Sequence, residues 1–260
     1  MIVISKKKFP AQKLAFTEAG EYAYFIPPGE APTHLSTPAI SPSRMQWYPN
    51  IEDLGRLTAF IPGNPGAGKS YLTNELLNLL PPDAEILLFT SLDEDDGNFD
   101  GLRKSGRLYK IRMTKDNLEK LTLSNIRRMC RNPVLVFDDV DKIRDKEISK
   151  LVFALMEDAL ANGRGHKHHD GVGDIHVICT SHSLNDYKKT KYTLENCDFV
   201  AVFPQSTTYS QMRRLYEKIG LTKEMCDNAI ALGKQKGIRY ILIHKVTPMF
   251  SLSGPLIELI

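Results

Sequence analysis

A short glycine-rich segment, placed between an apolar run and a helical pattern, constrains the fold of this 260-residue chain most. Residues 63–70 read GNPGAGKS and follow the apolar run RLTAFI (56–61), while SYLTNELLNLL comes next with the apolar spacing of a helix. Glycines let backbone N–H groups turn inward around an anion, and the N-terminus of the following helix adds a favourable dipole. A strand, this loop and a helix in that order predict a P-loop that binds phosphate groups.

The residues of this loop have separate predicted roles. We expect Lys69 to reach the β and γ phosphates of ATP and the Ser70 hydroxyl to bind Mg²⁺. A glycine turn without a ligand is the alternative. The expected ATP-binding residues are Gly63, Asn64, Pro65, Gly66, Ala67, Gly68, Lys69, Ser70 and Tyr71.

Short apolar runs separated by amphipathic stretches continue from Arg56 onward, which is typical of βαβ units. We therefore predict an α/β fold of the P-loop NTPase class, with a mostly parallel central sheet flanked by helices. A helix is expected at about 146–162, two short helices after Pro204, and a final strand in RYILIHKV (239–246). The further predicted strands are EILLFT (85–90), RLYKIRM (107–113), PVLVFD (133–138), DIHVICT (174–180) and DFVAVF (198–203).

The first 54 residues differ from the rest in composition and periodicity. They are rich in Pro, Ser and aromatic residues and show no sustained helical or alternating period. With 42% hydrophobic residues the chain can bury one substantial core. We predict a loop-rich extension over 1–54 and an ATPase domain over 55–260 that includes the C-terminal helices and final strand.

Charge, cysteine spacing and hydropathy restrict the class of protein. A formal net charge of +3 does not suit a basic tail that coats nucleic acid, so a nucleic-acid contact needs a local patch. The four cysteines form no CxxC pair, which argues against a zinc ribbon or a disulfide scaffold. No apolar run approaches the ~20 residues that span a bilayer. We expect a soluble protein that is not secreted and has no membrane-spanning segment.

Two adjacent acids end the predicted strand PVLVFD, in the order expected for the second half of a nucleotide site. We expect Asp138 to hold the metal and Asp139 to orient or deprotonate the attacking water. A helix cap is the alternative for Asp139, and Asp141 is expected to be a cap or a surface residue. The doubled acid makes hydrolysis of ATP the predicted reaction.

Small polar residues end the predicted strand DIHVICT. Thr180, Ser181 and His182 should lie at the carboxyl edge of the sheet, where ligands of open α/β folds bind. We predict that Ser181 senses the γ phosphate, with its two neighbours as further candidates and a turn residue as the alternative.

Other polar residues have weaker assignments. Arg164, after the long helix, is our candidate for an arginine that completes the site of a neighbouring subunit, against the alternative of a solvated surface residue. The other arginine candidates are Arg103, Arg107, Arg127 and Arg128. The histidines 166, 168 and 169 are expected to form a polar loop rather than a zinc site.

Two basic segments are candidate nucleic-acid contacts. DYKKTKYT (186–193) combines lysines and tyrosines that could hold a DNA backbone without reading sequence, although a solvated basic loop is the alternative. RRLYEK (213–218) is expected to be an amphipathic helix surface.

In combination these segments resemble the viral genome-packaging ATPases of the FtsK/HerA superfamily, which include poxvirus-type and virophage-type motors. The matching features, over roughly residues 56–250, are GNPGAGKS, VLVFDDVD, ANGRG, VICTSHSL and DFVAVFP. The resemblance implies a homo-oligomeric ring, pentamer or hexamer, that drives double-stranded DNA into a preformed capsid. It also implies capsid or portal-vertex proteins as partners, and a location in the host cytoplasm, a viral factory or the virion.

The resemblance assigns the same site residues as the motifs do. It places ATP and Mg²⁺ at Lys69 and Ser70, the metal at Asp138, catalysis at Asp139 and the sensor at Ser181. The insertion GHKHHDGVG between ANGR and the sensor strand departs from the family pattern and weakens the assignment of Arg164. The alternative functions are an AAA+ helicase or helicase loader, a nucleoside or small-molecule kinase, and a nucleotide-dependent scaffold with negligible turnover.

Overall fold

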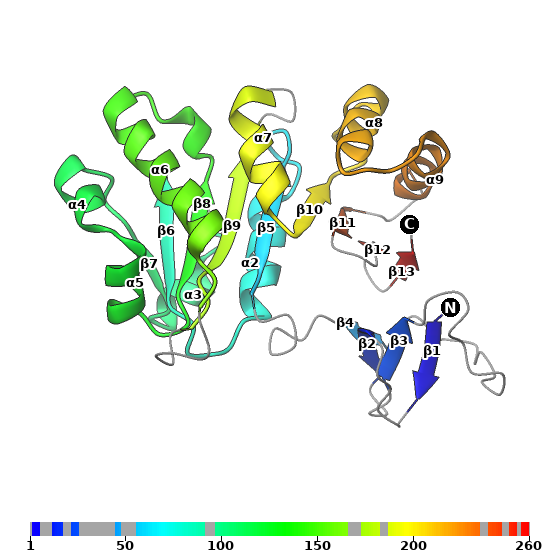
Figure 1. Cartoon of the computed structure of the whole chain (residues 1–260), viewed down its shortest axis with the longest axis horizontal. Helices are drawn as coiled ribbons and strands as arrows, with labels where there is room; N and C mark the ends of the chain where they lie inside the picture. Colours follow the sequence, from blue (N-terminus) through cyan, green and yellow to red (C-terminus); the bar gives the residue numbers. More distant parts are fainter. Residues whose placement is uncertain are drawn as a thin grey trace.

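The central element is a sheet whose middle strands run parallel (Figure 1). A computed structural model describes residues 56–91, 97–165, 173–182, 187–234 and 239–245, together with backbone strands inside 2–47 and 250–259. The strand order is β13-β12-β11-β10-β5-β9-β8-β6-β7. The strands are β5 (Thr58–Pro62), β6 (Ile86–Thr90), β7 (Leu108–Lys110), β8 (Val134–Asp138), β9 (His176–Ser181), β10 (Phe199–Val202), β11 (Ile241–His244), β12 (Phe250–Ser253) and β13 (Leu256–Leu259).

The strand directions confirm the predicted fold class. β10, β5, β9, β8, β6 and β7 pair in parallel, and each overlaps one of the six predicted apolar runs. β11 is antiparallel to β10 and lies in the predicted final strand. That strand is not the last, because β12 and β13 extend the sheet beyond it. Each of these two strands has four residues.

Helices cover both faces of the sheet, because alternate residues of each buried strand point to opposite sides. Val134 and Val136 of β8 belong to the same buried cluster as residues of α2 and α3, whereas Leu135 and Phe137 belong to the cluster that contains residues of α4–α9. The helices are α2 (Lys69–Asn78), α3 (Asp100–Lys104), α4 (Lys115–Lys120), α5 (Leu123–Met129), the short 3₁₀ helix η2 (Val140–Lys142), α6 (Lys146–Asn162), α7 (Tyr187–Asn196), α8 (Tyr209–Lys218) and α9 (Lys223–Gly233). The predicted helices at 146–162 and after Pro204 are confirmed.

The basic segment 186–193 is helical from Tyr187 onward and belongs to α7, so the alternative of a loop is wrong. Thr190, Thr193 and Leu194 lie at helical spacing and are buried. Two members of this buried stripe are threonines, so the stripe carries little apolar signal in the sequence. The segment 213–218 lies in α8, as predicted, and a capping box of Thr208 and Gln211 begins this helix.

The extension contains strands that the sequence pattern does not reveal. β1 (Ile2–Ser5), β2 (Gln12–Thr17), β3 (Tyr22–Phe25) and β4 (Met45–Trp47) form an antiparallel sheet in the order β1-β3-β2-β4. These strands are short, and the register of β2 shifts between Lys13 and Ala15. A shift of this kind interrupts the alternation by which a strand is recognised.

The cysteines and the lengths of the helices can be compared with the sequence predictions. Cys130, Cys179, Cys197 and Cys226 are all free thiols in the structure. Within the described ranges, no helix combines the length and apolar character needed to cross a bilayer.

A buried arginine connects the end of α6 to the sheet. Arg56 lies just before β5 and donates hydrogen bonds to the carbonyl oxygens of Ala159, Leu160 and Ile175. Gly163 follows α6 beside it, and a Cβ at Gly163 would lie 2.5 Å from an Arg56 Nη atom and 2.3 Å from the Ala159 oxygen. The glycine of the ANGRG segment is therefore explained by packing.

The same edge of the sheet holds a histidine that should make stability depend on pH. His176 accepts a hydrogen bond from the Leu57 N–H at Nδ1, 2.9 Å away, and burial lowers the pKa of its imidazole to about 4. The unfolded chain takes up this proton near pH 6.5, whereas the folded chain does so only near pH 4. We therefore expect the free energy of unfolding to decrease, by up to about 3 kcal/mol, as the pH falls through this interval.

Chemical denaturation at a series of pH values measures this decrease. His176→Asn keeps an oxygen that can accept the Leu57 hydrogen bond but has no titrating group, so its stability should change less between pH 6.5 and 4.5. Equal slopes for the variant and the wild-type protein would show that His176 is not responsible.

Candidate nucleotide-binding site

The loop between β5 and α2 has the backbone geometry of a phosphate cradle. Gly66 and Gly68 adopt φ angles of 77° and 105°, in the region that favours glycine. A Cβ at Gly63 would lie 3.0 Å from the Phe203 ring, so the chain also needs glycine there for close packing. The Gly63 N–H donates to the Ser181 carbonyl oxygen at 2.9 Å, which ties the loop to the end of β9.

The nine predicted ATP-binding residues lie in this one loop and in the first turn of α2. Asn64, Pro65 and Gly66 are exposed, and the Asn64 amide donates to the Ser206 carbonyl oxygen at 2.7 Å. Ser70 is half-buried at the start of α2, and Tyr71 is 40% exposed. The loop therefore offers backbone and side-chain donors to a ligand that approaches from solvent.

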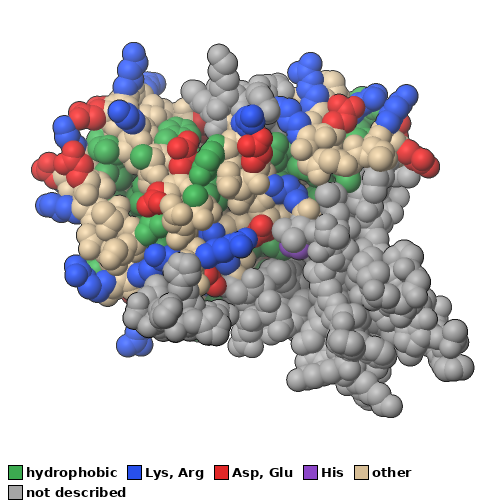
Figure 2. Space-filling view, viewed as in Figure 1, with side chains coloured by type: hydrophobic (Ala, Val, Ile, Leu, Met, Phe, Trp, Pro, Cys, Tyr) green, Lys and Arg blue, Asp and Glu red, His purple; other side chains and the backbone are tan. Residues whose placement is uncertain are grey.

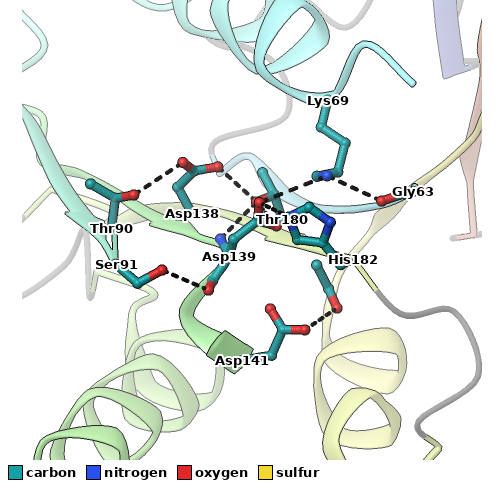
Figure 3. Close-up of polar contacts among 10 residues, drawn as sticks. Gly63, Lys69, Thr90, Ser91, Asp138, Asp139, Asp141, Thr180 and His182 are labelled. Carbon is teal, nitrogen blue, oxygen red and sulfur yellow. Dashed lines mark hydrogen bonds and ion pairs between the residues drawn. The ribbon is translucent and has the colours of Figure 1, made fainter. Parts of the chain in front are cut away.

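Lys69 points from the first turn of α2 towards the ends of β8 and β9 (Figure 3). Its ammonium donates to the Gly63 carbonyl oxygen at 3.1 Å and lies 3.8 Å from an Asp139 carboxylate oxygen. Lys69 is 7% exposed, so its charge is poorly solvated and interacts strongly with nearby anions. The lysine and the second acid of the FDD segment thus meet in one cluster.

Asp138 is buried at the end of β8, and two threonines orient it. Thr90 Oγ1 lies 3.3 Å from one carboxylate oxygen and Thr180 Oγ1 lies 2.8 Å from the other. A carboxylate has about four acceptor positions, so Asp138 can keep both contacts and still bind a metal ion or a metal-bound water. No group of three His, Cys, Asp or Glu side chains suited to a metal occurs among the described residues.

Asp139 has a strained backbone and charged neighbours. Its φ of 49° lies in the left-handed region, which few residues other than glycine adopt. The side chain makes no capping hydrogen bond to η2, so the helix-cap interpretation is wrong. Its carboxylate instead contacts Lys69 and His182 Nε2, and its N–H donates to Thr180 Oγ1 at 2.9 Å.

Thr180 connects the two acids. Its hydroxyl lies 2.8 Å from an Asp138 oxygen and 3.2 Å from an Asp139 oxygen. A hydroxyl has one proton, so it can donate to only one of these carboxylates at a time. Thr180 can therefore exchange its hydrogen bond when the charge on either acid changes.

The predicted sensor and its neighbour contact different acids. Ser181 Oγ donates to an Asp141 carboxylate oxygen at 3.4 Å, so half-buried Asp141 belongs to this cluster and is not a simple surface residue. His182 contacts Asp139 directly, and its Nδ1 is buried without a hydrogen-bond partner among the described atoms. His182 is thus closer than Ser181 to the predicted catalytic acid.

Arg164 lies away from this cluster. It follows α6, where the Gly163 carbonyl oxygen accepts from the Ile175 N–H just before β9 begins. Lys69 and Asp138 lie at the opposite, carboxyl edge of the parallel strands. Arg164 is exposed and does not reach its own chain's site, so its role in a neighbouring subunit stays a prediction. The histidines 166, 168 and 169 lie outside the described residues.

Arg127 and Arg107 also lie away from the cluster. Arg127 donates to the carbonyl oxygens of Asn162 and Arg164, beside the end of α6. Arg107 donates to the carbonyl oxygens of Pro81 and Ala84. These contacts stabilise the backbone at the edge of the sheet opposite the P-loop.

An arginine that the sequence reasoning missed lies beside the P-loop. The guanidinium of Arg239, just before β11, is 4.5 Å from the centroid of the Tyr71 ring. A Cβ at Gly68 would lie 3.6 Å from Arg239 Nε. A hydrogen bond to Glu75 raises the pKa of the Tyr71 phenol, and burial raises that of Tyr240 to about 12. Only the antiparallel pairing of β11 with β10 brings Arg239 to this edge, and no local sequence signal reveals that pairing.

Comparisons with known proteins find one related sequence and several distant folds. No family model matches the chain. The chain is 27% identical over 213 residues to the uncharacterized protein V3 of Sputnik virophage, which covers 78% of this chain and 76% of that protein. The chain is therefore similar in sequence to a protein of a virophage.

Two solved structures show low similarity in both sequence and shape. The pCW3 conjugation coupling protein TcpA, with ATPγS, is 14% identical at a TM-score of 0.46, over 79% of this chain and 60% of that one. The cytoplasmic domain of the Thermomonospora curvata type VII secretion ATPase EccC is 12% identical at a TM-score of 0.49, over 96% of this chain and 30% of that one. The chain thus spans less than two thirds of each, and its own site geometry is the stronger guide to function.

Proposed function

We propose that this protein is an ATPase motor that hydrolyses ATP with Mg²⁺ and moves double-stranded DNA. The observation that carries the enzymatic part is the meeting of Lys69, Asp138 and Asp139 at the mouth of a glycine-lined P-loop. The motor part is supported by the resemblance of the ordered segments to packaging ATPases, and the viral setting by the similarity to a virophage protein.

Each residue of the cluster has a role in this proposal. Ser70 and Asp138 hold Mg²⁺, which when bound neutralises charge on the phosphate oxygens. Lys69 turns from Asp139 towards the β and γ phosphates. Asp139, released from that ion pair, orients the attacking water and accepts its proton. Thr180 keeps both acids in position throughout.

The proposal extends to an assembly. A trans arginine, for which Arg164 is our candidate, would complete each site from the neighbouring subunit of a pentameric or hexameric ring. Ser181 and His182 would transmit the loss of the γ phosphate along β9. Packaging of a viral genome, with capsid or portal-vertex proteins as partners, is the most specific form of this proposal.

Steady-state ATP hydrolysis, measured with and without duplex DNA, tests the motor. We expect turnover that requires Mg²⁺ and increases when duplex DNA is added. A turnover rate that is the same with and without DNA would contradict the motor proposal. Transfer of phosphate to a small acceptor instead of water would also contradict it. Native mass in the presence of an ATP analogue and duplex DNA is the second measurement, and a strict monomer would argue against a ring.

Arg239 should contribute to binding of the nucleoside part of ATP. The γ-phosphate end of the site lies towards β8 and β9, so the base end lies on the β10 and β11 side, where Arg239 stacks on Tyr71. A stacked guanidinium is a good surface for a planar base. We expect Arg239→Ala to raise the KM for ATP about tenfold, because stacking of this kind is worth about 1–2 kcal/mol.

Inhibition by inorganic tripolyphosphate separates base recognition from phosphate recognition. Its inhibition constant should be unchanged in Arg239→Ala, since this ligand has no base. Arg214→Ala, which removes an exposed arginine of α8, is the matched control. A parallel loss of tripolyphosphate affinity would show that Arg239 contacts phosphate instead.

A further inference from the structure

A cavity of about 280 Å³ lies where α7 and α8 end, and lysines from three separate segments line it. Lys191 comes from α7, Lys218 from the last turn of α8 and Lys245 from the residue after β11. The described residues that line it are Lys191, Leu194, Glu195, Lys218, Ile219 and Lys245. Among these described residues, three have an ammonium group and one has a carboxylate.

The cavity is separate from the nucleotide site. The Lys245 N–H donates to the carbonyl oxygen of Asp198 at 2.8 Å, directly before β10 begins. This position is at the amino edge of the parallel strands, whereas Lys69 and Asp139 lie at the carboxyl edge. A ligand in the cavity would not compete with one in the P-loop.

The described side chains that line the cavity carry more positive than negative formal charge. Glu195 forms an ion pair with Lys191 at 3.7 Å, and Lys245 Nζ donates to the carbonyl oxygens of Leu194 and Glu195 at the end of α7. Burial, then repulsion from Arg214 and Lys191, lowers the pKa of Lys218. Burial lowers the pKa of Lys245 as well. A bound anion would relieve both the repulsion and the lost hydration.

Each of the two basic segments of the sequence contributes a lysine to the cavity. Lys191 belongs to DYKKTKYT and Lys218 to RRLYEK, which are far apart in the chain. Lys and Arg side chains project from the region of α8 on the face shown in Figure 2. Lysines act as point charges without base specificity, which suits a ligand whose sequence varies.

We propose that this cavity binds a phosphate of the backbone of double-stranded DNA. The choice of ligand rests on the proposed motor function. α7 packs against α6 and β5 and extends from the segment that follows His182 to the cavity. A shift of the β9 end on hydrolysis would therefore be transmitted along α7 to the bound DNA.

Fluorescence anisotropy of a labelled duplex of about 30 base pairs measures binding and tests the site. The titration is repeated over a range of NaCl concentrations. We expect Lys191→Gln with Lys218→Gln to weaken binding about tenfold near 0.1 M salt, and to reduce the slope of log K against log salt by about one to two. Lys150→Gln, an exposed lysine of α6, is the matched control. Lys245 is left intact because it bonds the end of α7.

The wild-type protein offers a second measurement that needs no variant. Duplex DNA should slow acylation of Lys191 and Lys218 by an amine-reactive reagent, read by mass spectrometry, while Lys150 reacts at the same rate. If the wild type binds duplex DNA but neither the affinity of the double variant nor the acylation changes, the cavity is not the site and the motor proposal stands. If the wild type binds no duplex DNA, both proposals fail.

Discussion

Asp139→Asn should reduce the turnover of ATP about a thousandfold while the protein still folds and binds ATP. The change removes the charge that would orient and deprotonate the attacking water, and general-base catalysis contributes typically about 10²–10⁴ in rate. Asn tolerates the left-handed backbone better than most residues, so the φ of 49° can persist. Steady-state hydrolysis and equilibrium binding of a fluorescent ATP analogue measure the two effects separately.

Asp145→Asn is the matched control for that result. Asp145 caps α6 by accepting from the N–H groups of Glu147 and Ile148, and an Asn side chain can accept the same bonds. Its turnover should remain near that of the wild type. If Asp139→Asn keeps more than a tenth of the wild-type rate, Asp139 is not the base and His182 or a residue from a neighbour must be considered.

The sequence predicts the central strands, whose buried faces are apolar, and misses α7, whose buried face is largely not apolar. Five parallel strands, β5, β6, β8, β9 and β10, and α6 have strong hydrophobic patterns because both faces of the sheet are covered there. α7 buries Thr190 and Thr193, so its pattern looks polar. In β2 the register shift between Lys13 and Ala15 interrupts the alternation.

Some residues of the candidate site are recognised from contiguous motifs, whereas others join the site only through tertiary contacts. Residues 63–71 and the acids at 138 and 139 are predictable because each motif is contiguous and ends a strand. The contact of Thr90 with Asp138 depends on the pairing of β6 with β8, and Arg239 reaches Tyr71 only because β11 returns antiparallel to β10. Periodicity within one segment carries no information about strand order, so these contacts need the tertiary structure.

The second large effect is on the stability of the fold, and it involves Arg56 at the amino edge of the parallel strands. Arg56→Met should lower the free energy of unfolding by about 4 kcal/mol and the Tm by about 10 °C. Arg56 is 8% exposed, and its guanidinium donates to three carbonyl oxygens, two of them at the C-terminal end of α6. Methionine fills a similar volume but leaves these carbonyls without a donor and removes a cation from the negative end of the helix dipole.

The burial of Arg56 also lowers its pKa, and the nearby charges of Asp198 and Asp174 oppose that shift. A lysine would keep a positive charge but cannot place donors on three carbonyls in a planar fork, so Arg56→Lys should recover only part of the loss. Arg112→Met, which removes an exposed arginine, is the matched control and should change the stability by less than about 0.5 kcal/mol. Chemical denaturation of the three variants measures the differences. If Arg56→Met and Arg112→Met are equally stable, the carbonyls at the end of α6 find other donors, and Arg56 does not hold α6 against the sheet.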